Sequence, residues 1–458
     1  MDLLKDNPRK LFWKFLVPAV SSAVALAIYS FVDTIVIGQD SGPNGTAACA
    51  VVLPIFSIAH FLALLCGVGG SVLMSKARGE GNREKGNAYY TASLLYVGIV
   101  TLVLWILGVV FQVPIYRLFG ADDVLLPYAL DYGKWIFGAF PSFVLVSYLG
   151  CFIRTDGAPK FVMTVTLIGG VMNIIGDIVL VFPLGMGMAG AAIATVTGSV
   201  VQSILLISYI LLGKTSLKLS KPFKWFTAVK KISVIGFGAG LPQVAMTVVT
   251  FIINNQIMKY SGSAALAVYG LLCTIAALFL SIFEGIGQAA QPIVSANFGA
   301  KQKERYHIIA KIGMRTAVVF GVISFAVCAL FPSEIIKLFM KVTPEVAEIA
   351  PHIIRVYTIS FFPMAINMFV TAYLQSVTKA TPATIISLLR GLVLSSVLLY
   401  VLPLFMESDG IWWAVTIAEA LAATFAVACM IPELRKKNEI KECQIPIYQA
   451  VSDGSIIV

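Results

Sequence analysis

Twelve apolar runs, each long enough to form a membrane-spanning helix, take up most of this sequence. A hydrocarbon core about 30 Å thick is crossed by about 20 helical residues. Of the 458 residues, 59% are hydrophobic and 12% are charged, whereas a typical soluble protein carries roughly 25% charged residues. We therefore predict an all-α polytopic membrane protein, with crossings at residues 11–37, 47–75, 89–113, 127–152, 161–182, 188–212, 232–258, 264–295, 310–331, 350–376, 383–404 and 411–431.

Positive charges are unevenly divided among the segments that connect these runs. With the N-terminus inside, 25 of the 33 lysines and arginines lie in cytoplasmic segments, Arg154 among them, and 4 lie in external loops. This asymmetry follows the positive-inside rule, so we expect both termini in the cytoplasm. Arg390 lies near the inner end of its run and can snorkel to the cytoplasmic surface. The net charge of +10 is then an orientation signal and a match to anionic lipid, not a nucleic-acid footprint.

Short motifs of the first half recur in the same order in the second half. The pairs are Pro18 with Pro242, Ala47–Val51 with Ala264–Val268, Phe140-Pro141 with Phe362-Pro363, and Pro159 with Pro382. Each half holds six runs, and an even number makes the two repeats parallel. We expect an N-terminal six-helix lobe at 1–212, a basic cytoplasmic linker at 213–231, a C-terminal six-helix lobe at 232–431 and a cytoplasmic tail at 432–458. Two such lobes can rock against each other around a shared cavity.

Asp33 lies inside the first apolar run. An acid at that depth is costly, so it is normally retained where it faces a cavity, a partner or a transported ion. In the fifth run, Asn173 and Asp177 are four residues apart and share one helix face. The predicted topology places Asp177 at nearly the depth of Asp33, and Thr195 of the sixth run at nearly that of Asn173. These four residues are the predicted ion-coupling site.

Two coupling ions suit this cluster. Two carboxylates in one low-dielectric pocket are costly to ionise together, so at least one is expected to take up a proton near neutral pH. The oxygens of Asp33, Asn173 and Asp177 also suit sodium, a hard cation that takes oxygen ligands. The alternative is a hydrogen-bonded structural cluster, although Ser, Thr and Asn alone would serve that purpose. Pro18 removes a backbone donor and is expected to let the first helix bend.

Other polar residues inside the runs are candidates for a substrate pathway. They are Tyr29, Asn254, Glu284, Gln288, Asn367 and Glu419. We expect Glu284 and Glu419 either to line the pathway or to pair with a neighbour such as Arg390. Near the outer start of the fourth run, Asp131 and Lys134 are expected to form an interfacial pair. The glycines of Gly67-Val-Gly-Gly-Ser71 favour close helix packing.

The cysteines and the first run give no sign of a metal site or a cleaved leader. Six of the seven cysteines lie inside predicted crossings without a CxxC or other metal spacing, which is typical of packing residues. We expect no resident cofactor or metal, with a proton or sodium as the coupling ion. The first run is too long for a signal peptide and lacks a small-residue cleavage site, so it is expected to stay in the mature protein.

Several stretches, taken in their order and spacing, resemble one known family. They are Tyr29–Gly38 with Asp33, Gly67–Asn82, Asn173–Phe182 running into Gly187–Thr195, and Gln291-Pro292 through Gly299-Ala300. Together they resemble the multidrug and toxic compound extrusion (MATE) transporters, and within them the bacterial DinF-like and MepA-like branch. The likeness covers nearly the whole chain, including the two six-helix repeats and the basic loop between them.

The resemblance implies a V of two six-helix lobes that exports amphipathic cationic compounds in exchange for protons or sodium. By position, Asp33, Asn173, Asp177 and Thr195 match the coupling site of that branch, and Pro18 matches the proline at which its first helix bends. This sequence departs from the family at two places. Gly150 stands where the branch has an asparagine of that site. The acids that the NorM-like branch carries on helices seven and ten are also not found here. The nearest polar residues are Asn254, Asn255 and Asn367.

The leading hypothesis is therefore an ion-coupled multidrug exporter, not an enzyme, in the bacterial plasma membrane. We expect it to be monomeric, surrounded by lipid and without a nucleic-acid partner. The alternative is a flippase for a lipid-linked sugar or another amphiphile, which would be expected to line its cavity with several arginines. A membrane-embedded enzyme is disfavoured because only three histidines are present and no nucleophile has a neighbouring histidine. A channel is disfavoured because two lobes enclose a cleft rather than a symmetric pore.

The charge asymmetry makes an orientation prediction. In a cysteine-free background, a cysteine at position 218 should react with an impermeant thiol reagent only from the cytoplasmic side, and a cysteine at position 43 only from outside. Labelling of intact cells and of inverted vesicles measures both. The reverse pattern would overturn the topology.

Overall fold

The computed structural model describes residues 3–119, 121, 123–221, 224–339 and 344–435, and all regular secondary structure within them is helical. The predicted all-α class is thereby confirmed. The first half holds α1 (Pro8–Gly79), α2 (Arg83–Val110), α3 (Gln112–Leu118), α4 (Leu125–Gly138), α5 (Phe140–Thr155), α6 (Pro159–Val181) and α7 (Gly187–Leu211).

The second half continues with helices of more uneven length. They are α8 (Trp225–Tyr260), α9 (Gly262–Gly299), α10 (Lys303–Leu330), α11 (Pro332–Phe339), α12 (Pro344–Thr358), α13 (Phe361–Ser376), α14 (Ala380–Leu388), the π-helical turn η1 (Leu389–Val393), α15 (Leu394–Val401), α16 (Pro403–Met406) and α17 (Asp409–Arg435). α8 begins inside the predicted linker 213–231. Most of the predicted tail 432–458 lies outside the described residues, since α17 ends at Arg435.

The predicted crossings map onto these helices. Within the described residues, 10 helices are long and apolar enough to cross a membrane, or 11 if the bent pair α4 and α5 is one span. The remaining predicted crossing is α8. Its 36 residues extend over about 54 Å at about 1.5 Å per residue, which is enough to cross.

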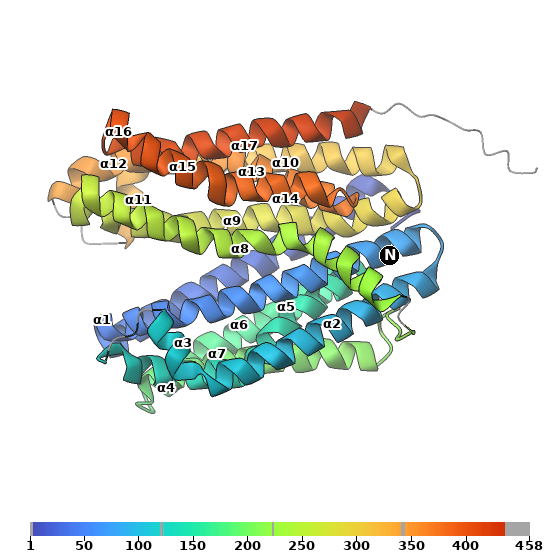
Figure 1. The fold of residues 1–458 in the computed structure, drawn as a ribbon, viewed down its shortest axis with the longest axis horizontal. Helices are drawn as coiled ribbons and strands as arrows, with labels where there is room; N and C mark the ends of the chain where they lie inside the picture. The colour runs from blue at the N-terminus through green and yellow to red at the C-terminus, as the bar shows by residue number, and fades with distance from the viewer. Residues whose placement is uncertain (1–2, 120, 122, 222–223, 340–343, 436–458) are drawn as a thin grey trace, which may run out of the picture.

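α1 holds the first two crossings, Pro8–Tyr29 and Val51–Gly79. Both of its ends meet the end of α9. Asn297 Nδ2 donates a hydrogen bond to the carbonyl oxygen of Leu3, just before α1, at 3.0 Å, and Gly79 packs against the backbone of Ala296. The two crossings therefore run antiparallel, as the two blue segments of Figure 1 do. The two predicted crossings, 11–37 and 47–75, are thus two separate spans, although the helical assignment runs through the connection between them.

Two crossings predicted as continuous are broken in the structure. Residues 127–152 are divided between α4 and α5, which are bent by 50°, and residues 350–376 between α12 and α13. The motif Phe140-Pro141 stands at the first break and Phe362-Pro363 at the second. Proline is tolerated in the first turn of a helix, where its missing N–H has no intrahelical partner. The recurring motif therefore marks an interruption in both halves, with a sharp bend in the first and a single continuing span, Val346–Ser376, in the second.

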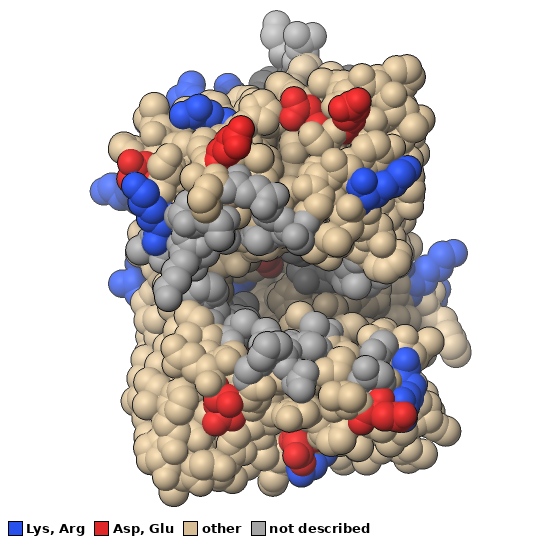
Figure 2. All heavy atoms as spheres, turned by 90° about the vertical axis from the view of Figure 1, so that its left-hand side faces the viewer, with Lys and Arg blue, Asp and Glu red and all other residues tan. Residues whose placement is uncertain are grey.

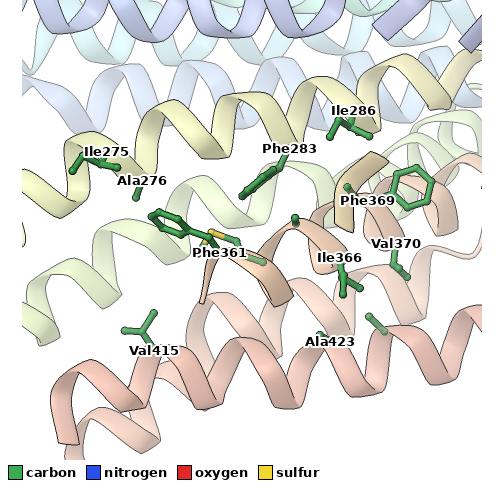
Figure 3. Close-up of a cluster of buried hydrophobic side chains, with 14 of the residues drawn as sticks. Ile275, Ala276, Phe283, Ile286, Phe361, Ile366, Phe369, Val370, Val415 and Ala423 are labelled. Atoms are coloured by element: carbon green, nitrogen blue, oxygen red, sulfur yellow. The ribbon is translucent and has the colours of Figure 1, made fainter. Parts of the chain in front are cut away.

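The helices form two bundles that lie side by side. Figure 1 shows α8–α17 above α1–α7, and we call them the C-terminal and the N-terminal bundle. Each has its own hydrophobic core. Figure 3 shows part of the C-terminal core, where Phe283 of α9 lies toward Phe361 of α13, while Phe369 of α13 and Val415 of α17 lie at opposite sides of the cluster. The exact lobe boundaries of the sequence analysis stay a proposal.

The first crossing of α1 belongs to both cores. Its beginning, including Phe12, Phe15 and Ala19, packs into the C-terminal core, whereas Val36 and Ile37 near its end pack into the N-terminal core. Pro18 lies at the transition, and its carbonyl oxygen accepts a hydrogen bond from Ser22 Oγ at 2.7 Å. The helix continues through Pro18, so a change of bend there stays a prediction.

Glycines bring the two bundles into backbone contact near the ends that hold the chain termini. Gly69 faces the carbonyl of Ile232, and Gly236 in turn faces the carbonyl of Leu65. Close by, Gly79 and Gly299 approach the other bundle's backbone in the same way. The sequence prediction that Gly67–Ser71 serves close packing is therefore confirmed. We call this contact of α1 with α8 and α9 the interbundle interface.

This interface predicts a selective effect of one methyl group. A Cβ in Gly236→Ala would overlap the carbonyl of Leu65, a backbone atom that cannot rotate away, whereas a Cβ in Gly270→Ala meets no atom within 4 Å. We expect Gly236→Ala to lengthen the distance between spin labels at positions 84 and 304, measured by pulsed electron resonance, and Gly270→Ala to leave it unchanged. Equal distances in both variants would show that the contact does not hold the bundles together.

Candidate functional site

Three of the four predicted coupling residues meet in the N-terminal bundle. Asp33 comes from α1, Asn173 from α6 and Thr195 from α7. Thr195 Oγ1 donates to Asp33 Oδ1 at 3.5 Å and accepts from Asn173 Nδ2 at 3.0 Å. The contact with Asp33 is longer than the usual O–H···O distance of about 2.7–2.8 Å. The carboxylate of Asp33 is thus loosely held.

Asp177, the fourth predicted residue, follows Asn173 by one turn of α6. Its side chain is 0% exposed and that of Asn173 is 2% exposed. Both carboxylate oxygens of Asp177 and Oδ1 of Asn173 are buried without a hydrogen-bond partner. Buried polar atoms are nearly always paired. Three unpaired oxygens on one helix face therefore mark a place where a proton or a cation would be stabilised.

Tyr132 is a member of this cluster that the sequence analysis missed. Its hydroxyl donates to Asp33 Oδ2 at 3.4 Å, and its side chain is buried. The neighbouring residues Asp131 and Lys134 form the predicted exposed pair at 3.0 Å. Because Asp131 and Lys134 share an exposed helix face, Tyr132 must lie on another face of the helix. This spacing was the available signal for a buried tyrosine.

A cavity lies between the two bundles. Its volume is about 100 Å³, and apolar residues such as Leu64, Val68 and Ala372 make up much of its wall. The polar side chains in the wall include Arg154, Glu284, Gln288, Gln375 and Arg390. A mostly apolar wall with a few polar groups is the lining typical of sites for drug-sized molecules, although the cavity is smaller than such sites in this arrangement of the bundles. At the other end, Figure 2 shows the face on the left of Figure 1 hollowed between the bundles.

Glu284 and Gln288, two predicted pathway residues, lie in the wall of this cavity. Gln288 Nε2 donates to Glu284 Oε1 at 2.8 Å. Arg154 of α5 donates to Gln288 Oε1, so the chain of contacts joins the two bundles. Counting Arg154 with the cytoplasmic loops was wrong, because it is partly buried in the cavity wall. The end of α5 extends into the interbundle interface rather than into solvent.

Glu419 and Asn367 form a separate buried cluster with Arg390. Arg390 Nη2 lies 3.0 Å from Glu419 Oε1, and the two side chains are 10% and 6% exposed. Asn367 Nδ2 donates to Glu419 Oε2 at 2.7 Å. Pairing, one of the two expectations for Glu419, is thus what the structure shows. Arg390 does not snorkel to the surface, because the π-helical turn η1 presents it to Glu419 and the cavity.

Two other predicted pathway residues lie elsewhere. Among the described residues, the wall of this cavity includes neither Tyr29 nor Asn254. The ring of Tyr29 lies against Gly170 of α6, so it packs between α1 and α6. Asn255, the neighbour of Asn254, donates to the carbonyl oxygen of Phe251 at 2.9 Å.

A family model described as MatE matches residues 18–179 and 239–401, one match in each half. The chain belongs to the MATE family. It is 28% identical over 427 residues to the multidrug export protein MepA of Staphylococcus saprophyticus, which covers 92% of this chain and 93% of that protein. The resemblance found in the sequence is thereby confirmed.

Solved MATE structures share the fold. The MATE multidrug transporter DinF-BH in complex with rhodamine 6G has a TM-score of 0.84 and 28% identity, covering 94% of this chain and 98% of that one. An outward-facing multidrug resistance MATE transporter of the MOP superfamily has a TM-score of 0.88 and 21% identity, covering 95% and 98%. The MATE family places this chain in the membrane as a transporter.

The buried pair of this MATE protein makes a stability prediction. Removing one partner of a buried ion pair leaves an uncompensated charge, which costs about 3–5 kcal/mol. Glu419→Ala should therefore lower the midpoint of thermal unfolding in detergent markedly, and Arg390→Met combined with Glu419→Met should recover most of the loss. Asp131→Ala, at the exposed pair, is the control and should cost about 0–1 kcal/mol. A Glu419→Ala protein as stable as the control would contradict the pairing.

Proposed function

We propose that this protein is a secondary active multidrug exporter that moves amphipathic cationic compounds out of the cell in exchange for protons or sodium. The observation that carries the proposal is the pair of acids Asp33 and Asp177 within a membrane-spanning bundle, one loosely bonded and one without a hydrogen-bond partner. An ionisable group at membrane depth is a functional candidate by default. We also propose that the protein lies in the bacterial plasma membrane. The proposed orientation, with both termini cytoplasmic, rests on the charge asymmetry.

The donor set of the cluster fits either coupling ion. A proton on Asp177 would remove its charge and turn one of its oxygens into a hydrogen-bond donor. A sodium ion would be held by oxygens of Asp33, Asn173 and Asp177, because hard cations take carboxylate and amide oxygens. Tyr132 and Thr195 keep the carboxylate of Asp33 oriented toward α4 and α7 at long distances. Both oxygens of Asp33 therefore have room to change partners when the ion arrives.

The lining of the cavity suits the proposed substrate class. Its wall is mostly apolar, which suits the apolar part of an amphipathic compound. Arg154 and Arg390 also reach this wall, yet each is matched by an acid: Arg390 by Glu419 directly and Arg154 by Glu284 through Gln288. The flippase alternative would call for arginines left free for an anionic group. The matched charges therefore favour the exporter.

α1 offers a physical route from ion to substrate. A ligand shifts a two-state protein only through its different affinity for the two states, and a carboxylate that is neutralised in one state supplies such a difference. Asp33 sits on the part of α1 that leads into the N-terminal core, and the part before Pro18 is packed into the C-terminal core. We infer that neutralising Asp33 changes the bend at Pro18 and thereby the angle between the bundles.

The relatives support the proposal by what they are known to do. MepA is a multidrug export protein, and the structure of DinF-BH, a multidrug transporter, holds rhodamine 6G. From these relatives we carry over the export of several amphipathic compounds. Exchange against an ion is carried over from the sequence analysis. We propose a monomer, since each bundle buries its own core and the cavity is complete within one chain.

Asp33→Asn tests the proposal because it keeps the size of the side chain and fixes it in a neutral form. The assay uses inverted vesicles under an imposed proton gradient or, separately, a sodium gradient. We expect the ion-driven transport of an amphipathic cationic dye by this variant to fall at least about tenfold, because tenfold corresponds to a typical coupling free energy between two sites. Asp33→Glu should keep partial activity. Asp131→Asn, an exposed acid of the same bundle, is the control and should transport normally. Wild-type rates and ion response in Asp33→Asn protein, at equal expression, would refute the proposal.

A further inference from the structure

A second cavity lies on the side of the interbundle interface, where α1 and α2 meet α8 and α14. Its volume is about 450 Å³, and it opens near the ends of these helices that are predicted to be cytoplasmic. Its wall holds four lysines, Lys76, Lys85, Lys230 and Lys231, and one acid, Glu80. It shares no residue with the substrate cavity described above.

The charges in this cavity are unbalanced. Lys85 pairs with Glu80 at 3.1 Å. Lys76 contacts the hydroxyl of Thr378 at 3.4 Å and lies over the ring of Phe298, neither of which carries a negative charge. Lys230 and Lys231 are adjacent and exposed at the mouth. Basic pockets between membrane helices on the cytoplasmic side bind anionic lipid headgroups. The cavity therefore suits a phosphate-bearing group.

An apolar groove continues from the cavity along α8 and α14. Val234 and Ala380 line both, and the groove adds Phe237, Thr381 and Ile385 over a volume of about 430 Å³. Phe237 is 41% exposed and Ile385 is 37% exposed, so its walls face outward. Ser233, at its edge, donates to the hydroxyl of Tyr96 of α2 at 3.2 Å. The groove is thus closed on one side by the N-terminal bundle.

Along α8, charged residues are followed by apolar ones, in the same order as the headgroup and acyl chains of a phospholipid. Lys230 and Lys231 come first, Val234 follows one turn later and Phe237 about one turn after that. A headgroup at the lysines would therefore leave an acyl chain directly over the groove. A soluble phosphate would use the lysines alone and leave the groove unused.

We propose that this cavity and groove bind one anionic phospholipid, with its phosphate at the four lysines and an acyl chain between α8 and α14. The lipid contacts helices of both bundles, so it bridges them in the arrangement described here. The site is independent of the proposed transport function, because it shares no residue with the ion cluster or the substrate cavity.

Native mass spectrometry of the detergent-purified protein tests the site. The probes are palmitoyl-oleoyl phosphatidylglycerol and phosphatidylcholine with the same acyl chains, added separately and in competition. Each lysine near an anionic headgroup contributes about 1 kcal/mol of attraction. We therefore expect phosphatidylglycerol to bind at least about tenfold more tightly than phosphatidylcholine. Lys230→Gln combined with Lys231→Gln should remove most of this preference. Thr381→Trp, which fills the groove, should weaken binding of both lipids and leave their ratio unchanged.

Matched controls separate this site from general surface charge and from free phosphate. Lys214→Gln combined with Lys218→Gln removes the same charge from the exposed connection before α8 and should leave the preference intact. Soluble glycerol phosphate should not displace phosphatidylglycerol at equal concentration. The proposal is overturned if the two lipids bind equally, if the control pair lowers the preference as much as the cavity pair, or if glycerol phosphate competes as well as the lipid.

Discussion

The packing of one helix into two hydrophobic cores links the parts of this structure that matter for transport. The first crossing of α1 begins among residues of the C-terminal bundle and ends among those of the N-terminal bundle. Asp33 and Pro18 both lie on it, about four turns apart. Because protein interiors are close-packed, a change in the direction of this helix cannot be absorbed locally. It must move one core relative to the other, which is what alternating access requires.

Buried charges are treated in opposite ways in the two bundles. In the C-terminal bundle, Glu419 has Arg390 and Asn367 within hydrogen-bonding distance, so its charge is compensated in place. In the N-terminal bundle, Asp177 has no partner, and Asp33 is bonded to two hydroxyls at 3.4 and 3.5 Å. An uncompensated acid at this depth is tolerated only if something neutralises it. The compensated acid stabilises its bundle, and the uncompensated pair is where the proposed coupling ion would bind.

Much of this arrangement was predictable from the sequence, because the membrane restricts the backbone to helices and the positions of acids within apolar runs are visible. Asp33, Asn173 and Thr195 were brought together by depth arguments alone. The helix breaks at Pro141 and Pro363 were not, since a proline inside an apolar run is compatible with a kink, a break or a first turn. Tyr132, Arg154 and Arg390 were missed or misplaced for another reason. Their roles depend on which helix faces which across the bundle, and local periodicity does not contain that information.

The interbundle interface is held by close backbone packing at glycines and by a few hydrogen bonds. In a bilayer, helices gain no hydrophobic driving force from contacting each other rather than lipid, so close packing and hydrogen bonds must hold them. The glycine contacts supply the packing, and three of the bonds across the interface are long: Ser75 to the carbonyl of Pro292 at 3.2 Å, Gln291 to Ser71 at 3.2 Å, and Lys76 to Thr378 at 3.4 Å. Within the C-terminal bundle, the hydrogen bond from Asn367 to Glu419 measures 2.7 Å. Arg154 of α5 adds a charged hydrogen bond to Gln288 of α9, so a small number of polar contacts joins the bundles, and few bonds would have to change partners if the bundles moved.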